Sequence, residues 1–475
     1  MVKTTQVFTP TKTPTHTSVR RENLWQDLSD LAEQGGAFIP VLGVTKLGKT
    51  TLVKALMEKS ASVYIPSQEL TSGSSSLWSY LAAALEIPSS STKGKVEGNK
   101  AKWGLFGKFG IKVPGLSTSS GAEIGGERSR DTSTGATYEV ELSSAVTEAM
   151  RLLAENAVET ESHPPTIVLD DFHFVTDSDK RREILLALRP VMEQGATLIL
   201  ASLPGREHDE AYRGTNLDGR LAHITVPTWD REELQQIATL GFEALNVSAL
   251  SQTVELLIDH SYGSPQIMQQ LCLNLCRFNN VQDDKSEVDI LSAPDDWTAF
   301  FRRVKDTQSV NWLNRLGFGL PERGQSRNRF TLKDGRNFDG YQLILWAIHE
   351  LGSPSEVGLA DVTDKIADLV GETPKTVLRR YSLEAKAKNM NVIASRDMES
   401  ALKQASVKAP EDSTDDLDVE QETFSAEEIS VAELIPQPVF EASDDGPSGT
   451  MLRIMNPMLA YALAWHPESF ETSKR

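Results

Sequence analysis

The stretch that decides the fold runs Phe38-Ile-Pro-Val-Leu-Gly43-Val-Thr-Lys-Leu-Gly48-Lys49-Thr50. Its first five residues are apolar, which predicts a short buried strand, and residues 50–59 have helical spacing. From Gly43 to Thr50 the segment fits G-x-x-x-x-G-K-[ST] at every position. Such a loop cradles phosphates, because its glycines let backbone N–H groups curl around the anion and the following helix adds a positive dipole. The stretch therefore predicts a strand, a phosphate-binding loop and a helix in succession.

The residues of this loop have separate expected roles. We expect Lys49 to reach the β- and γ-phosphates of ATP and Thr50 to ligate Mg²⁺. The alternative is a chance match in an ordinary strand–loop–helix unit. The predicted nucleotide-binding residues of the loop are Gly43, Val44, Thr45, Lys46, Leu47, Gly48, Lys49, Thr50 and Thr51.

A second acidic motif follows further along the chain. Residues 166–171 read Thr-Ile-Val-Leu-Asp-Asp, an apolar strand that ends in two acids, as in a Walker B motif. We expect Asp170 to hold Mg²⁺ through water and Asp171 to orient or activate the attacking water. The alternative is a pair of acids that caps the next turn. The gap of 121 positions between Lys49 and Asp170 is long, and a Gly-rich insertion at 90–136 accounts for it.

The pattern of the first half predicts an α/β fold with a doubly wound parallel sheet, because apolar strands alternate with helices. The expected strands are 38–42, 62–65, 166–169 and 196–201, and the expected helices are 50–59, 77–85 and 143–154. A possible hairpin around 109–113 lies inside the insertion.

The second half is expected to be mostly helical, with a two-stranded hairpin near its end. The first group of expected helices is 231–245, 251–261 and 265–278, which make up a helical lid. One further helix, 295–304, follows the lid. The second group is 341–351, 359–370 and 374–388, followed by strands 438–441 and 451–454 around the turn SDDGPSG. Three helices and a two-stranded wing are typical of a winged-helix domain.

Charge is spread unevenly over the 475 residues. The net charge is −19, yet the segment 411–450 holds thirteen acids and no Lys or Arg. The negative total argues against general phosphate binding by the whole surface but does not exclude a local basic patch. Basic residues gather at 93–113, 302–336 and 374–388, where DNA contact, protein contact and a solvated helix face are the open alternatives. We also expect the acidic stretch to fold back and screen the basic helix.

The remaining composition limits the cellular setting. Only two cysteines occur, Cys272 and Cys276, one helical turn apart among leucines, so a packed helix is favoured over a metal site or a disulfide scaffold. No apolar run approaches the ~20 residues that span a bilayer, and the Thr-rich N-terminus lacks the apolar region of a signal peptide. We therefore expect a cytoplasmic protein with no membrane partner.

The order of the motifs resembles that of AAA+ and STAND P-loop ATPases, in the branch near origin-recognition-like ATPases. Besides the two Walker motifs, Arg20-Arg21-Glu22 resembles the Arg-Glu box near the adenine, and Leu200–Arg206 follows the strand where sensor 1 lies. Ser261-Tyr-Gly-Ser-Pro265 resembles the G-x-P motif of the lid. The resemblance implies that Arg20, Arg21 and Pro265 lie at the nucleotide. It also makes Arg206 and Arg220 candidates for sensing the γ-phosphate or for an arginine finger, with an exposed surface arginine as the alternative.

The resemblance also suggests a division of the chain. The expected parts are an N-terminal strap with the Arg-Glu box at 1–30, the ATPase core at 31–227, a helical lid at 228–285, a basic connector at 286–338, and a winged-helix domain at 339–475 that contains an acidic linker at 411–433.

Two departures from the family pattern bear on rate. AAA+ enzymes usually have Glu where this chain has Asp171, and the expected lid helix after Pro265 offers no sensor 2 arginine. Both favour a slow nucleotide switch over a fast motor. We therefore expect an ATP-binding switch or slow Mg²⁺-dependent ATPase that couples ATP or ADP state to homo-oligomerisation or to an effector protein, in conflict with mobile elements or phage. The alternatives are a DNA-binding initiator or transposition-type regulator that reads DNA through 374–388 and 302–336, and a non-hydrolysing ATP-bound scaffold.

Overall fold

The computed structural model describes residues 1–70, 73–87, 90–92, 137–139, 141–175, 177–203, 222–320, 327–395, 439–446 and 449–471. The chain forms two compact units. The core unit consists of Arg21–Gly43 and Lys49–Val226, and the second unit of Met1–Arg20, Val44–Gly48 and Pro227–Arg475. The five-part division expected from the sequence remains a prediction.

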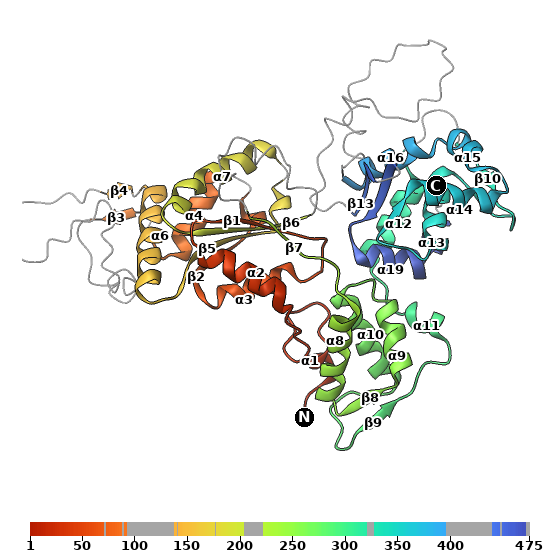
Figure 1. Ribbon diagram of the computed structural model, residues 1–475, viewed down its shortest axis with the longest axis horizontal. Coiled ribbons are helices and arrows are strands. Elements are labelled where there is room, and N and C mark those ends of the chain that lie inside the picture. Colours follow the sequence, from red (N-terminus) through yellow and green to blue (C-terminus); the bar gives the residue numbers. More distant parts are fainter. Residues whose placement is uncertain are drawn as a thin grey trace, which may run out of the picture. The chain divides into compact units, whose positions relative to one another are not determined.

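A five-stranded parallel sheet lies at the centre of the core unit, in the order β2-β5-β6-β1-β7 (Figure 1). Its strands are β1 (Phe38–Leu42), β2 (Ser60–Pro66), β5 (His163–Asp170), β6 (Thr197–Ser202) and β7 (Ile224–Thr225). All residues of β1 and β6 are buried, as continuous apolar runs in a parallel sheet require. The predicted α/β fold with a doubly wound parallel sheet is confirmed, and the strand order is that of P-loop NTPases.

Helices cover both faces of this sheet. The helices α2 (Glu22–Glu33) and α3 (Lys49–Met57) contact one face, and Figure 1 shows them together below the strands. On the other face lie α4 (Ser74–Ala84), α6 (Leu142–Glu159) and α7 (Ser178–Glu193), which share one apolar cluster with the sheet. The short elements η1 (Ser67–Leu70) and η2 (Phe172–Phe174) follow β2 and β5.

The ends of the expected Gly-rich insertion form a small antiparallel pair. Its strands are β3 (Ser90–Thr92) and β4 (Thr137–Glu139). Residues 93–136, with the hairpin expected at 109–113, lie outside the described residues.

Three helices and a parallel strand pair form one group in the second unit, in the stretch that the sequence predicts to be the lid. They are α8 (Arg231–Ala244), α9 (Ser251–Asp259) and α10 (Pro265–Phe278), with β8 (Val247–Ala249) paired to β9 (Asp289–Leu291). The predicted helix at 265–278 matches α10 at both ends. Cys272 and Cys276 are buried in this helix with free thiols, as expected of a packed core.

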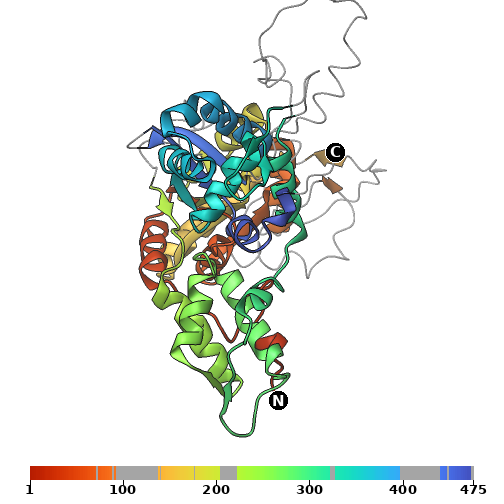
Figure 2. The ribbon, with the colours of Figure 1, turned by 90° about the vertical axis from the view of Figure 1, so that its right-hand side faces the viewer.

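The N-terminal segment is built into the lid. It begins with α1 (Thr4–Val7), and Val7 and Phe8 join the apolar cluster of the lid helices. The Thr4 hydroxyl donates to the Val281 carbonyl at 2.9 Å, and the Thr9 amide donates to the Gln269 side chain at 2.7 Å. Figure 2 shows this red segment beside the green helices. The first residues therefore stabilise the lid by packing and by hydrogen bonds.

Gly241 of α8 lies directly against Phe8 of the N-terminal segment, so a substitution there probes how tightly the segment packs. A β-carbon at Gly241 would lie 2.3 Å from the Phe8 ring, although Gly241 is in the interior of α8. Alanine favours a helix over glycine by about 1 kcal/mol, whereas overpacking costs about 1–3 kcal/mol. We expect Gly241→Ala to lower the free energy of unfolding in urea and to expose residues 1–20 to limited proteolysis.

A double variant provides the control. Phe8→Leu shortens the side chain that the new methyl group would meet, so Gly241→Ala should be less harmful in the Phe8→Leu background than in wild type. Equal effects of Gly241→Ala in both backgrounds would show that Phe8 is not the cause.

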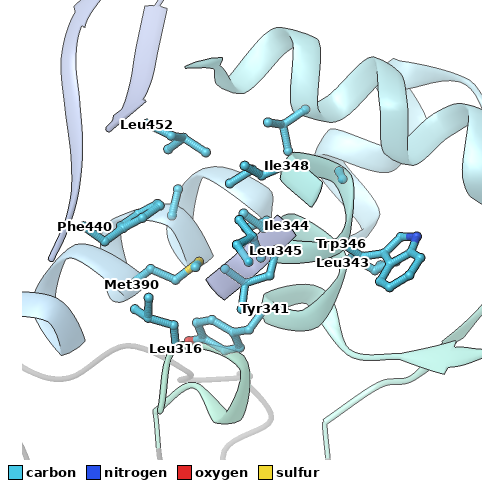
Figure 3. Close-up of a cluster of buried hydrophobic side chains, with 14 of the residues drawn as sticks. Leu316, Tyr341, Leu343, Ile344, Leu345, Trp346, Ile348, Met390, Phe440 and Leu452 are labelled. Carbon is cyan, nitrogen blue, oxygen red and sulfur yellow. The ribbon is translucent and has the colours of Figure 1, made fainter. Parts of the chain in front are cut away.

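The C-terminal part of the second unit has the winged-helix arrangement. Its three-stranded antiparallel sheet has the order β12-β14-β13, and α13 carries most of the core that Figure 3 shows. Its elements are α11 (Trp297–Phe301), α12 (Thr307–Phe318), β10 (Phe330–Thr331), β11 (Asn337–Phe338), α13 (Gly340–Glu350), β12 (Glu356–Gly358), α14 (Leu359–Val370), α15 (Pro374–Arg380), α16 (Leu383–Ser395), β13 (Phe440–Gly446), β14 (Gly449–Ile454), α19 (Pro457–Trp465) and α20 (Glu468–Glu471).

Two expectations for this part are wrong in detail. The single helix predicted at 374–388 is two helices, α15 and α16, because Tyr381 turns into the core and Ser382 adopts a left-handed backbone at φ 49°. The turn predicted at SDDGPSG is shorter, because β13 continues through Ser443 to Gly446 with a bulge. The Thr450 hydroxyl donates to Asp444 at 2.7 Å across this pair.

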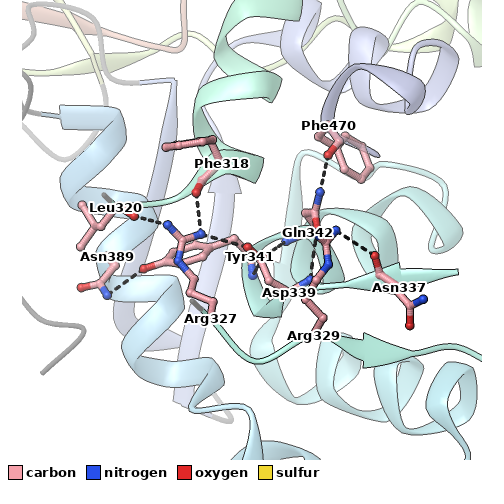
Figure 4. A network of polar contacts seen from close by, with 10 residues as sticks. All are labelled: Phe318, Leu320, Arg327, Arg329, Asn337, Asp339, Tyr341, Gln342, Asn389 and Phe470. Carbon is pink, nitrogen blue, oxygen red and sulfur yellow. Dashed lines mark hydrogen bonds and ion pairs between the residues drawn. The ribbon is translucent and has the colours of Figure 1, made fainter. Parts of the chain in front are cut away.

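Two bases of the basic segment 302–336, Arg327 and Arg336, make contacts within the winged-helix domain. Arg327 is almost fully buried and pairs with Asp339 at 2.9 Å, and it donates to the carbonyls of Phe318 and Leu320 (Figure 4). Asp339 also caps α13 by accepting from two of its backbone amides. Arg336 lies over the Trp346 ring at 3.7 Å. These two charges therefore stabilise the winged-helix domain.

Candidate nucleotide site

The phosphate-binding loop needs glycine at its first and sixth positions for different reasons. A β-carbon on Gly43 would lie 2.8 Å from the Val226 carbonyl oxygen, because β1 and the segment after β7 run close together. Gly48 has φ 93°, a left-handed backbone that residues with a β-carbon rarely adopt. The geometry thus gives a structural reason for both glycines of the motif.

Lys49 is the first residue of α3 and points back along the loop. Its side chain is buried, and its Nζ donates to the Gly43 carbonyl at 2.7 Å. Burial lowers the pKa of Lys49 to about 8, against the opposing effect of the Asp171 and Asp170 carboxylates. A buried cation whose Nζ donates to a carbonyl of the loop is suited to bind an anionic phosphate.

Thr50 and Asp170 form the second part of the site. The Thr50 hydroxyl donates to Asp170 Oδ2 at 2.8 Å, and Asp170 is buried at the end of β5. A hydroxyl beside a carboxylate matches the few oxygen ligands that a protein offers to Mg²⁺ when phosphates supply the rest. The residues present therefore fit the metal that the motifs imply.

Asp171 differs from Asp170 in backbone and exposure. It has φ 54° and ψ 43°, a left-handed conformation that costs of order 1–3 kcal/mol in a residue other than glycine. Its side chain is 38% exposed, and His173 Nε2 lies 4.0 Å from Asp171 Oδ1. Burial and then the Asp170 charge raise the pKa of Asp171, while Lys49 lowers it. A carboxylate with a raised pKa and access to solvent can accept a proton from water.

Residues that the sequence did not single out also belong to this region. Tyr64 of β2 donates to Asp170 Oδ2 at 2.5 Å, and His173 lies beside Asp171.

In the second unit, the Trp229 indole N–H donates to the Leu47 carbonyl of the loop at 2.9 Å. The Trp229 backbone N–H donates to the Gly263 carbonyl at 3.0 Å. Two features of the sequence could have indicated these residues. Tyr64 is an aromatic residue in the strand that follows the loop helix, and Trp229 directly precedes Asp230, the N-cap residue of α8.

For the other predicted site residues that the structure describes, it gives positions in the fold. Arg21 is the N-cap residue of α2, and Arg20 ends the N-terminal stretch of the second unit. Pro265 is the first residue of α10, whose N-cap Ser264 accepts from the Ile267 amide. Thr51 is exposed on α3. Arg206 and Arg220 lie outside the described residues, so their roles remain predictions.

Two other kinds of feature are absent from the part of the chain that the structure describes. Within the described ranges, His, Cys, Asp and Glu side chains form no group of three or more that could hold a metal ion. None of the helices in the described part combines the length and apolar character that a bilayer crossing needs.

Solved structures resemble the chain over nearly its whole length. No family model and no curated protein matches the sequence. A Walker-type ATPase of Pyrococcus abyssi has a TM-score of 0.48 at 14% identity, with 94% of this chain and 99% of that chain covered. The Aeropyrum pernix ORC2 protein, solved as ADPNP–ADP complexes, has a TM-score of 0.43 at 14% identity, covering 98% and 97%. Cdc6p from Pyrobaculum aerophilum has 0.35 at 12% identity, covering 99% of each chain. Identities of 12–14% mean that these similarities concern the fold alone.

The lowered pKa of Lys49 predicts how nucleotide binding depends on pH. Phosphate favours protonated Lys49, and above pH 8 the unbound protein increasingly loses that proton. The affinity for a fluorescent ATP analogue should fall between pH 8 and 10, by up to about tenfold per pH unit.

Two variants isolate this effect. Lys49→Met should bind weakly and show no such slope, whereas Lys180→Met on α7 should keep the wild-type profile. A wild-type affinity that stays level from pH 7 to 9.5 would contradict the low pKa.

Proposed function

We propose that the protein is an ATP-binding switch and slow Mg²⁺-dependent ATPase of the STAND/AAA+ type. The observation that carries this is the meeting of Lys49, Thr50, Asp170 and Asp171 at the carboxyl ends of β1 and β5. Ligands of open parallel sheets bind at this end of the strands. A cation, a hydroxyl and two carboxylates of different exposure are the groups that phosphoryl transfer to water uses.

Each residue has a role in this proposal. Lys49 exchanges its bond to the Gly43 carbonyl for bonds to phosphate oxygens, and Thr50 with Asp170 holds Mg²⁺. When bound, the metal neutralises charge on the phosphates. Asp171 orients the attacking water and accepts its proton. Its side chain is one methylene shorter than the usual glutamate and its backbone is strained, which supports slow turnover.

Contacts of the loop support coupling to the lid. Within the second unit, Trp229 joins the Leu47 carbonyl to the Gly263 carbonyl, which lies just before α10. Further along the lid, the His260 ring packs on Phe301 at 4.4 Å and on Trp465 of α19 at 5.0 Å. A change in the loop on nucleotide binding therefore has a packed route toward the winged-helix domain. Oligomerisation or binding of an effector protein is the proposed output.

Substitution of Asp171, the second Walker B acid, should distinguish ATP hydrolysis from nucleotide binding. Asp171→Asn keeps the size of the side chain and removes its capacity to accept a proton, so the ATPase rate should fall by about 10²–10⁴ while nucleotide affinity changes little. The measurement is phosphate release beside equilibrium binding of the fluorescent analogue.

The matched control is another aspartate of the core unit. Asp177→Asn makes the same change at the N-cap of α7, where the asparagine oxygen can still accept from the amides of Asp179 and Lys180, and it should leave the rate per folded molecule unchanged. A wild-type ATPase rate in Asp171→Asn would contradict the proposed base. Nucleotide binding without hydrolysis by the wild type would favour the ATP-bound scaffold.

A second candidate function is DNA binding through α15. Lys375 and Arg379 lie four residues apart and are both exposed on this helix. The other bases of the expected reading helix are engaged: Arg380 pairs with Glu372, Lys388 with Asp444, and Lys386 is buried. The exposed charge is therefore smaller than the sequence suggested.

DNA binding can be tested by salt dependence. If α15 contacts phosphates, the double variant Lys375→Ala and Arg379→Ala should weaken duplex binding and reduce the slope of log K against log salt by about two. Substituting Lys180 and Arg182 of α7 in the same way should change neither. Undetectable binding of the wild type at low salt would exclude this function.

A further inference from the structure

The Asp170 carboxylate is held by three donors from three parts of the core unit. Asp170 Oδ2 accepts from the Thr50 hydroxyl at 2.8 Å and from the Tyr64 hydroxyl at 2.5 Å, and Oδ1 accepts from the Asp171 amide at 3.1 Å. A buried carboxylate needs such donors, because burial without them disfavours its charged form. Thr50 and Asp171 belong to the Walker motifs, whereas Tyr64 belongs to neither.

The pleat of β2 brings Tyr64 to this carboxylate. Val63 and Ile65 point into the apolar cluster with α4, α6 and α7, so Tyr64 between them points to the opposite face, where α3 lies. Tyr64 is in register with Val168 of β5, and Pro66 with Asp170. The tyrosine side chain thus reaches along the neighbouring strand by two residues to the acid at its end.

The loop helix supports the same arrangement. Thr50 and Lys54 are one turn apart on α3 and therefore share a face. Thr50 contacts Asp170, and Lys54 Nζ lies 5.1 Å from the centre of the Tyr64 ring.

We propose that Tyr64 is a positioning residue of the magnesium site, which holds the Asp170 carboxylate in one orientation before the metal arrives. This inference rests on the proposed function of the site. A second partner that orients a metal-binding carboxylate commonly contributes 10–100-fold to metal affinity. Tyr64 should therefore act on the metal and not on the nucleotide itself.

The test is a magnesium titration of Tyr64→Phe, which removes the hydroxyl and keeps the ring. Binding of mant-ADP to the full-length protein is followed by fluorescence as MgCl₂ is added, and again in EDTA. The magnesium midpoint should rise by about tenfold or more in the variant. Mant-ADP affinity in EDTA should stay at the wild-type value.

The control is Tyr80→Phe, the same change at a half-buried tyrosine of α4 that packs against the apolar cluster of the sheet. Its magnesium midpoint should equal that of wild type. A Tyr64→Phe protein with the wild-type midpoint overturns the inference, even if its melting temperature without ligand falls. A wild type without magnesium-dependent mant-ADP binding overturns the proposed function and this inference with it.

Discussion

The hydrogen bond from Thr50 to Asp170 is the interaction on which the rest of the site depends. It joins the first turn of α3 to the end of β5 across two separate sequence motifs. Asp170 is buried, and a buried carboxylate is stable as an anion only where donors surround it. The bond therefore fixes the start of the loop helix against the sheet. It also places the Asp170 carboxylate where the proposed site needs a metal ligand.

The order of the strands makes this bond possible. Lys49 and Asp170 are 121 positions apart, and most of that distance is the segment between β2 and β5. Because β1 and β5 both lie beside β6 and all run parallel, their carboxyl ends meet at one edge of the sheet. An insertion between β2 and β5 does not alter this edge, since it starts and ends at the antiparallel pair β3 and β4.

Sequence patterns predicted most of the fold, because its signals are local. The apolar runs 38–42 and 166–169 and the helix 265–278 were predicted from hydrophobic spacing, and the two Walker motifs assigned Lys49 and Asp170 to one site. Tyr64, His173 and Trp229 were missed because their importance comes from contacts between elements. Nothing near Tyr64 in the sequence shows that β2 pairs with β5. The break at Ser382 was missed because helical spacing continues across it, whereas burial of Tyr381 decides the direction of the chain.

The charges around Lys49 bear on how nucleotide and metal would bind together at the proposed site. Burial disfavours the Lys49 cation, while Asp170 and Asp171 favour it, and the balance leaves its pKa near 8. The same two carboxylates disfavour each other, which helps to raise the pKa of Asp171. A phosphate bound at Lys49 would stabilise the cation, and a magnesium ion at Asp170 would stabilise the carboxylates. Because the phosphate is an anion and the metal is a cation, each attracts the other, so nucleotide and metal should bind cooperatively. Within the second unit, the Leu47 carbonyl of the loop accepts from Trp229, which is the proposed link from bound nucleotide to the lid.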